Sequence, residues 1–375
     1  MNKDGLRQKK VFLYWNGFSY QIFHPIANSL LKFGFKVYTI ENPFTKLDRK
    51  YRLHSEFNGN KTHTLIRKKR SLVGTPIGHL FDIFWPMNSL KADVAICFSP
   101  HLTLRNIMLK RLGLVKLVVQ WNIDYSPVRF SNPLLQKMYV LIDKIGVKYS
   151  DYQIDLTKIA QQSRLFSHEI EHSGKNLIVP VGTNFKKLPD FNSRPNFNLV
   201  FVGNFNETQD VEILLKCMIL PRLEKLNVEL HVVGSGSSFE LLKSKYDRMN
   251  IFFHGNLGQT QIDLILSKCH VGLAPYIENP KSFSRFSDPS KLKKYSEFGL
   301  PIIMTDVTHN AKYLEKLGVA LVGKCEVDFF ASSIEKLYGN KSQLEAMSKK
   351  SKDFCLLNSW DQNLKPLFNV LKNLN

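Results

Sequence analysis

The segment that decides the fold spans residues 271–307 and reads VGLAPYIENPKSFSRFSDPSKLKKYSEFGLPIIMTDV. Apolar runs at 270–273 and 301–305 predict two buried strands near its ends. Between them, Asp288-Pro289-Ser290 predicts the start of a helix over 289–298, because Asp and Ser cap helices and Pro is favoured in the first turn. The segment therefore predicts a strand, a loop, a helix and a second strand in succession.

Lys291 falls in the first turn of this predicted helix. A cation there opposes the helix dipole, so we expect another group to compensate it. A lysine beside the exposed N–H groups of a helix start suits a diphosphate. The alternative is that Lys291, Lys293 and Lys294 form a solvated helix face, as charge runs usually do.

Three glycine-containing turns follow predicted strands upstream of this segment. They are Gly203-Asn204-Phe205, Gly234-Ser235-Gly236-Ser237 and His254-Gly255-Asn256. Glycine lets the backbone approach a ligand closely, and ligands of open parallel sheets bind beyond the carboxyl ends of the strands. One such turn often reflects tight-turn geometry alone, whereas three in strand order favour a nucleotide site.

Strands and helices alternate along the whole chain, which predicts an α/β fold with two tandem Rossmann-like parallel-sheet domains. A polar stretch with two prolines, 183–198, is the predicted linker, and residues 45–72 are predicted to be an irregular, basic surface excursion. The predicted domains are an N-terminal domain at 1–185, a C-terminal domain at 186–358 and a last helix at 359–375. The predicted strands are 9–15, 35–40, 93–98, 114–121, 151–155, 176–181, 199–203, 228–234, 251–254, 270–273 and 301–305. The predicted helices are 19–33, 101–112, 132–147, 157–171, 209–219, 237–247, 260–268, 289–298, 326–338, 341–355 and 360–373.

The net charge of +20 is concentrated in the first half of the chain. Residues 1–190 hold 29 Lys and Arg against 13 Asp and Glu, whereas residues 191–375 hold 23 against 19. The first half therefore predicts an anionic partner, namely a phospholipid surface, a lipid-diphosphate acceptor or a nucleic acid. The alternative is a solvated lysine-rich surface.

The apolar runs are too short for a secretory signal or a membrane helix, so we expect a cytoplasmic protein that is peripheral at the inner face of the cell membrane. The basic run at 61–70 has no aromatic residue, which ranks a nucleic-acid-binding protein last. No D-x-D pair is present to hold a metal against a diphosphate, so we expect no metal and no cofactor.

Residues 199–322 resemble the donor-binding domain of GT-B glycosyltransferases. The shared motifs are FVG, V-V-G-x-G, F-H-G, V-G-L-A-P-Y and P-S-K-L-x-x-Y-x-x-x-G-L-P-I-I, of which the last is the most specific. The first half resembles bacterial polysaccharide and lipid-linked-sugar transferases more loosely, through Asn16-Gly17 and QWNIDYSPVRFS at 120–131.

The resemblance implies two domains facing each other across a cleft, with a nucleotide-sugar donor, most simply a UDP-sugar, on the C-terminal side. The acceptor would lie on the N-terminal side, near Asn16 and Gly17. The last helix would pack back on the first domain. The implied donor-binding residues are Gly203, Asn204, Gly234, Gly236, His254, Gly255, Tyr276, Ser290, Lys291 and Lys294.

The chain departs from the retaining members of this family, which carry two glutamates spaced E-x7-E. Phe286 and Lys294 stand at those positions here, and Glu297 lies too far along to substitute. A cation thus replaces a glutamate that holds donor hydroxyls, which resembles the xanthan-type glucuronosyltransferases and favours an acidic sugar donor.

An inverting transferase needs a base for the acceptor hydroxyl and positive charge for the leaving diphosphate. Asp124, just past a predicted strand, is the candidate base, and Arg129 is the candidate group to orient it or to hold an acceptor phosphate. The alternative for Asp124 is a turn residue in Asp-Tyr-Ser-Pro, and His24 is the rival base.

The sequence therefore predicts a metal-independent hexosyltransferase that moves a sugar from a nucleotide-diphosphate donor to a lipid-linked or polysaccharide acceptor. A GT-B-fold nucleotide-sugar epimerase is the alternative, although such enzymes need more carboxylates and histidines than this chain offers in the cleft. A basic nucleic-acid-binding protein is the second alternative.

Overall fold

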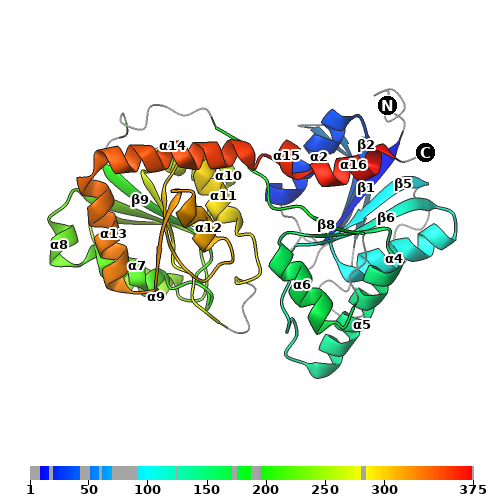
Figure 1. The fold of residues 1–375 in the computed structure, drawn as a ribbon, viewed down its shortest axis with the longest axis horizontal. Helices are drawn as coiled ribbons and strands as arrows, with labels where there is room; N and C mark the ends of the chain where they lie inside the picture. Colours follow the sequence, from blue (N-terminus) through cyan, green and yellow to red (C-terminus); the bar gives the residue numbers. More distant parts are fainter. Residues whose placement is uncertain are drawn as a thin grey trace. The chain divides into compact units, whose positions relative to one another are not determined.

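A computed structural model describes residues 9–16, 20–42, 51–58, 61–69, 91–123, 125–170, 175–186, 194, 196–279 and 284–373. The chain forms two compact units, one of residues 1–180 with 363–375 and one of residues 181–362 (Figure 1). No helix within the described ranges has the length and apolar character needed to cross a bilayer.

The first unit contains an eight-stranded sheet in the order β4-β3-β2-β1-β5-β6-β7-β8. Its strand pairs are parallel except for β2–β3 and β3–β4, which are antiparallel. The strands are β1 (Lys10–Asn16), β2 (Lys36–Asn42), β3 (Tyr51–Asn58), β4 (Lys61–Lys69), β5 (Ala92–Cys97), β6 (Val115–Asn122), β7 (Tyr152–Asp155) and β8 (Asn176–Ile178). The helices are α2 (Tyr20–Phe33), α4 (Pro100–Arg111), α5 (Pro133–Tyr149), α6 (Lys158–Ser167) and α16 (Lys365–Lys372).

The antiparallel pair β3–β4 shows that the prediction of an irregular excursion at 45–72 is wrong. The two strands pair from Tyr51 with Lys69 to Asn58 with Lys61. Apolar and polar residues largely alternate between Tyr51 and Phe57, and Asn58-Gly59 comes next in the sequence. Together they are the sequence signal of such a hairpin, and the basic composition of the stretch masked it. The first sheet is therefore mixed at one edge.

The second unit contains a six-stranded, fully parallel sheet in the order β11-β10-β9-β12-β13-β14. Its strands are β9 (Phe197–Val202), β10 (Val228–Val233), β11 (Ile251–Gly255), β12 (Val271–Ala274), β13 (Ile302–Thr305) and β14 (Ala320–Gly323). Its helices are α7 (Val211–Met218), α8 (Pro221–Glu224), α9 (Phe239–Lys245), α10 (Gln259–Leu266), α11 (Ser290–Glu297), α12 (Ala311–Lys316), α13 (Val327–Gly339) and α14 (Lys341–Leu357). The short helix α15 (Trp360–Asn363) follows α14 at the end of this unit.

The core of the second unit explains its parallel topology. All four residues of β12 and all four of β13 are buried, as expected for central strands covered by helices on both faces. Helix α11 contacts β12 and helix α13 contacts β13, and Figure 1 shows both helices in the second unit. The predicted α/β fold with two Rossmann-like domains is confirmed.

The last helix, α16, belongs to the first unit. The ring of Phe368 stacks on that of Phe33 in α2, with centroids 4.2 Å apart and an interplanar angle of 8°. Leu367 and Leu371 are fully buried beside it. The C-terminal segment therefore completes the core of the N-terminal domain.

Candidate functional site

The glycines that follow β9 and β10 and the glycine that ends β11 meet at the carboxyl edge of the second sheet. The Gly203 N–H donates to Val233 O (3.0 Å), and the Gly234 N–H donates to Gly255 O (2.8 Å). Gly234 has φ of +132°, and a Cβ there would overlap the carbonyl oxygen of Gly203. The three predicted glycine turns are therefore neighbours, and Gly234 needs to be glycine for both its conformation and its close packing.

The loop after β9 continues this contact. Phe205 forms a parallel bridge with Gly236 and donates its N–H to Ser235 O (2.9 Å). A Cβ on Gly236 would overlap the carbonyl oxygen of Phe205. Asn204 is exposed between these contacts, so its side chain is available to a ligand.

Helix α11 begins beside the same loop. Pro289 is its N-cap residue and Ser290, which is exposed, its first residue. The prediction that Asp288 or Ser290 caps the helix is wrong, because no side chain makes the capping hydrogen bond. Asp288 instead accepts the Val181 N–H (2.8 Å) and lies 3.6 Å from Lys293 Nζ, which fixes the loop before the helix.

Lys291 extends from this helix start over the end of β9. Its Nζ donates to Gln209 Oε1 and lies 4.3 Å from the centroid of the Phe201 ring and 5.3 Å from that of Tyr276. A Cβ placed on Gly203 would approach the same Nζ to 2.5 Å. Lys291 and the glycine turns therefore converge on one edge of the sheet.

Burial lowers the pKa of Lys291 to about 7. Over the part of the chain that the structure describes, no carboxylate lies within ion-pair distance of its Nζ. The N–H groups in the first turn of α11 add further positive potential. The edge of the sheet thus favours an anion.

The other lysines of α11 have carboxylate partners. Lys294 Nζ lies 2.7 Å from Asp263 Oδ1 and 2.9 Å from Glu297 Oε2. These two carboxylates balance its charge, so its role in donor binding stays a prediction. Lys293 is buried beside Asp288, so the solvated helix face considered for these lysines does not exist.

Tyr295, on α11, ties the helix to the sheet. Its hydroxyl accepts the Val202 N–H (2.9 Å) and donates to Leu273 O (3.1 Å), so it bridges the ends of β9 and β12. Gly272 is glycine because a Cβ there would overlap the Tyr295 ring. These contacts set where Lys291, four residues earlier, begins its side chain.

Tyr276 and His254 contribute differently from one another. Tyr276 is buried, and its ring lies beneath Lys291 while its carbonyl accepts the Thr305 hydroxyl (2.7 Å). The His254 imidazole hydrogen-bonds that of His231 (3.0 Å) on β10. Burial lowers the pKa of His254, and burial together with His254 and Lys268 lowers that of His231 to about 4, so both rings are neutral at pH 7.

The predicted residues of the N-terminal domain are only partly described. The backbone of Asn16 ends β1, whereas its side chain, Gly17 and Asp124 lie outside the described residues. Arg129 is exposed, with its guanidinium 5.6 Å from the centroid of the Tyr139 ring. The catalytic roles of Asp124 and Arg129 stay predictions.

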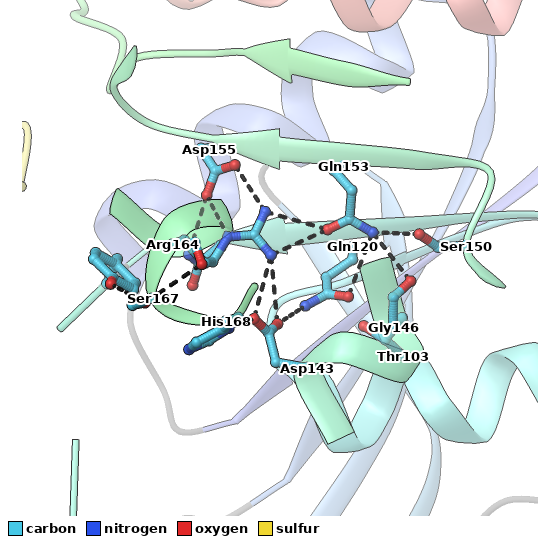
Figure 2. Close-up of polar contacts among 12 residues, drawn as sticks. Thr103, Gln120, Asp143, Gly146, Ser150, Gln153, Asp155, Arg164, Ser167 and His168 are labelled. Atoms are coloured by element: carbon cyan, nitrogen blue, oxygen red, sulfur yellow. Dashed lines mark hydrogen bonds and ion pairs between the residues drawn. The ribbon is translucent and has the colours of Figure 1, made fainter. Parts of the chain in front are cut away.

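A buried charge network lies behind the ends of β6 and β7 and was not predicted. Figure 2 shows Arg164, from α6, between Asp155 and Asp143, with Nη2 2.8 Å from Asp155 Oδ2 and Nη1 3.4 Å from Asp143 Oδ2. His168 Nδ1 lies 2.7 Å from Asp143 Oδ2. Gln153 contacts the guanidinium on its remaining side.

Opposite charges within the network offset the effect of burial on Arg164 and Asp143. Burial alone would lower the pKa of Arg164, but Asp155 and Asp143 raise it. Burial would raise the pKa of Asp143, but Arg164, His168 and Gln120 hold it below its ordinary value. The network is joined to the strand ends through Asp155, the last residue of β7, and through Asn122, the last residue of β6, which donates to Asp155 Oδ1 (3.1 Å). Because Arg164, Asp143 and Asp155 are all buried, we assign the network a role in supporting these strand ends. The one sequence signal for this network was an arginine, Arg164, within a predicted helix. The spacing of residues along the chain does not reveal which carboxylates pair with it.

Comparisons with known proteins agree with this geometry. Residues 196–340 match the family model described as "Glycosyl transferases group 1", and a comparison with curated proteins gives no match.

Three solved structures share the fold over nearly all of both chains. Sucrose-phosphate synthase from Thermosynechococcus elongatus is 13% identical with a TM-score of 0.73, over 98% of this chain and 99% of that one. HepE from Anabaena, solved in complex with UDP, is 11% identical with a TM-score of 0.67 (98% and 100%). WaaG, a glycosyltransferase involved in lipopolysaccharide biosynthesis, is 16% identical with a TM-score of 0.65 (97% and 100%). Residues 196–340 thus match a group 1 glycosyl transferase domain, and the chain has the fold of the GT-B glycosyltransferases.

Proposed function

We propose that the chain is a hexosyltransferase that binds a nucleotide-diphosphate sugar, most simply a UDP-sugar, at the carboxyl edge of the second sheet. The observation that carries the proposal is the convergence of Lys291, the start of α11 and the turns at Gly203 and Gly234. Backbone N–H groups and a cation without a carboxylate partner suit a diphosphate. HepE, of the same fold, was solved with UDP.

The chemistry asked of this edge is stabilisation of the leaving diphosphate. As the bond from the sugar to the diphosphate breaks, negative charge grows on the diphosphate oxygens. The Lys291 ammonium and the α11 N–H groups would stabilise that charge without a metal ion. Lys291, whose pKa is about 7 in the free protein, would become fully protonated beside the product.

Deprotonation of the acceptor hydroxyl is assigned to Asp124, with Arg129 as its orienting or phosphate-binding partner. We propose a lipid-linked or polysaccharide acceptor at the cytoplasmic membrane face, since the first half is basic and WaaG takes part in lipopolysaccharide biosynthesis. Asp124→Asn is expected to spare donor binding and to lower turnover by a factor on the order of a hundred.

The test is slow donor hydrolysis by the full chain. Incubation with UDP-, GDP- and dTDP-sugars, neutral and acidic, with and without EDTA, should release nucleoside diphosphate from one donor class at an EDTA-insensitive rate. Inhibition by EDTA would overturn metal independence. If no donor is hydrolysed or protects the protein from thermal unfolding, the transferase proposal fails, and conversion of the sugar without its release would favour an epimerase.

A further inference from the structure

The N-terminal half of α5, together with the loop before it, exposes a continuous apolar surface. Its exposed members are Val128 (55%), Phe130 (37%), Leu134 (67%), Leu135 (37%), Met138 (46%) and Leu141 (58%). We call these six residues the α5 apolar surface. In Figure 1, α5 extends past the strands of the first sheet. Exposed apolar residues are common singly, but six within fourteen positions mark a contact surface.

The helix places this surface opposite its packed side. The buried residues of α5 are Asp143, Gly146 and Val147, all in its C-terminal half. With 3.6 residues per turn, Leu134, Met138 and Leu141 form a stripe on the face turned away from those three. The stripe therefore does not take part in the core of this unit.

Hydrogen bonds hold the loop rigidly against the helix. The Asn132 side chain caps α5 by accepting the N–H groups of Leu134 and Leu135. The Gln136 side chain accepts the N–H groups of Arg129 (3.0 Å) and Phe130 (3.1 Å) and donates to Pro127 O (3.0 Å). Val128 and Phe130 are thus presented in a fixed arrangement, so docking costs little further ordering of the backbone.

The charges around the surface are positive. Arg129, Lys137 and Lys148 are exposed, and Lys137, Lys144 and Lys148 follow one flank of the stripe. Lys144 pairs with Glu169 (3.3 Å). The only carboxylate in residues 125–149 is Asp143, which is buried against Arg164.

We infer that the α5 apolar surface inserts into the head-group layer of an anionic phospholipid bilayer, with the flanking cations on the lipid phosphates. This inference rests on the proposed function in that it supplies the membrane contact for a lipid-linked acceptor. An apolar helix face with a cationic flank is the chemistry that anionic bilayers bind. A second copy would bring like charges together. Phe130 is the one aromatic ring among the six residues, whereas single-stranded nucleic acids stack successive bases on several rings.

The test is sedimentation of the full chain with vesicles of phosphatidylcholine alone or mixed with phosphatidylglycerol. Leu134→Gln with Met138→Gln is expected to lower the partition coefficient about tenfold or more on the mixed vesicles. Lys137→Glu with Lys148→Glu is expected to lower the partition coefficient about fivefold for each lysine removed, and only on vesicles that contain phosphatidylglycerol. The matched controls are Leu241→Gln with Leu264→Gln, exposed on α9 and α10, and Lys243→Glu with Lys349→Glu, and both should bind as the unaltered chain does.

Failure to sediment with mixed vesicles, or equal binding by the Leu134→Gln, Met138→Gln variant, would overturn the inference. Light scattering without lipid measures the oligomeric state of that variant. A change from the state of the unaltered chain would assign the α5 apolar surface to contact with a second copy, and would also overturn the membrane inference. Donor hydrolysis in lipid-free solution separates the two proposals. A chain that hydrolyses donor without binding vesicles loses only the membrane surface, and one that binds vesicles without binding donor loses only the transferase.

Discussion

Arg164 in the first unit and Lys291 in the second are both cations held inside the protein, and their surroundings differ. Arg164 is fully buried and lies between the carboxylates of Asp143 and Asp155. Lys291 contacts an amide oxygen and two aromatic rings. A cation whose charge is balanced stabilises the fold, whereas one left unbalanced is free to bind an anion from outside.

Helix α11 repeats this contrast within a few residues. Lys293 and Lys294 lie beside carboxylates, and Lys291 does not. The nearest neighbours of a lysine, rather than its position in a run of lysines, therefore identify the residue that awaits a ligand.

The largest effect is expected from Arg164→Met. This change leaves two carboxylates buried without their cation, which should lower the free energy of unfolding by about 3–5 kcal/mol. Chemical denaturation measures this loss. The control is Arg222→Met, which breaks the surface pairs with Asp328 and Glu335 and is expected to cost less than about 1 kcal/mol. Adding Asp143→Asn and Asp155→Asn should restore part of the loss, and no restoration would contradict the charge-balance explanation.

Lys291→Met is expected to act on the ligand instead of the fold. UDP affinity, measured by calorimetry, should fall about ten- to hundredfold because a charge-assisted contact is lost. The melting temperature of the free protein should stay or rise, because a partly buried cation without a carboxylate is removed. If Lys291→Met instead lowers stability as much as Arg164→Met and leaves UDP binding unchanged, then Lys291 stabilises the fold and does not bind the ligand.

The pH dependence should separate Lys291 from the rest of the site. Its pKa is lowered from 10.5 to about 7 in the folded chain, so between these values the unfolded chain holds one more proton and the contribution of Lys291 to stability rises with pH. A diphosphate binds the protonated form, so UDP affinity should fall as pH rises above about 7. Calorimetry in buffers of different ionisation enthalpy should show proton uptake on binding at pH 8, and none in Lys291→Met.

Gly234→Ala tests the glycine turns that accompany Lys291. The added Cβ would overlap Gly203 O at a φ of +132°, so we expect a stability loss of about 1–3 kcal/mol and weaker UDP binding. Gly339→Ala is the matched control, because a Cβ there meets nothing within 4 Å. If Gly234→Ala and Gly339→Ala have the same free energy of unfolding and the same UDP affinity, the turn at Gly234 accommodates a Cβ without loss of stability.

The smallest effect is expected from Lys294→Ala. Its ammonium is already paired with Asp263 and Glu297, so UDP affinity should change less than about threefold. A loss as large as that of Lys291→Met would make Lys294 a donor ligand, as the resemblance implies. Both variants belong in the same calorimetric series.

Much of the fold was predictable because buried parallel strands are short apolar runs bounded by glycine or proline. Gly203 follows β9, and Pro301 precedes β13. The hairpin of β3 and β4 was missed because its lysines hid an alternating pattern. The short strand β14 was missed because three of its four residues are only partly buried.

At the site, the convergence of Gly203, Gly234 and Lys291 followed from strand order, which the sequence reveals. The sequence does not reveal that Lys294 pairs with Asp263 or that Asp288 accepts the Val181 N–H, because tertiary packing brings these residues together. The same holds for Arg164, whose two carboxylates lie nine and twenty-one residues away along the chain.

The hydroxyl of Tyr295 has a mechanical consequence. Because this hydroxyl is bonded to Val202 and Leu273 at once, it ties α11 to the ends of both central strands, β9 and β12. If the proposed donor binds here, we expect a longer or bulkier sugar to be accommodated by the connecting segments around Asn204 and Ile277, because the distance from Lys291 to the strand ends is set by these hydrogen bonds.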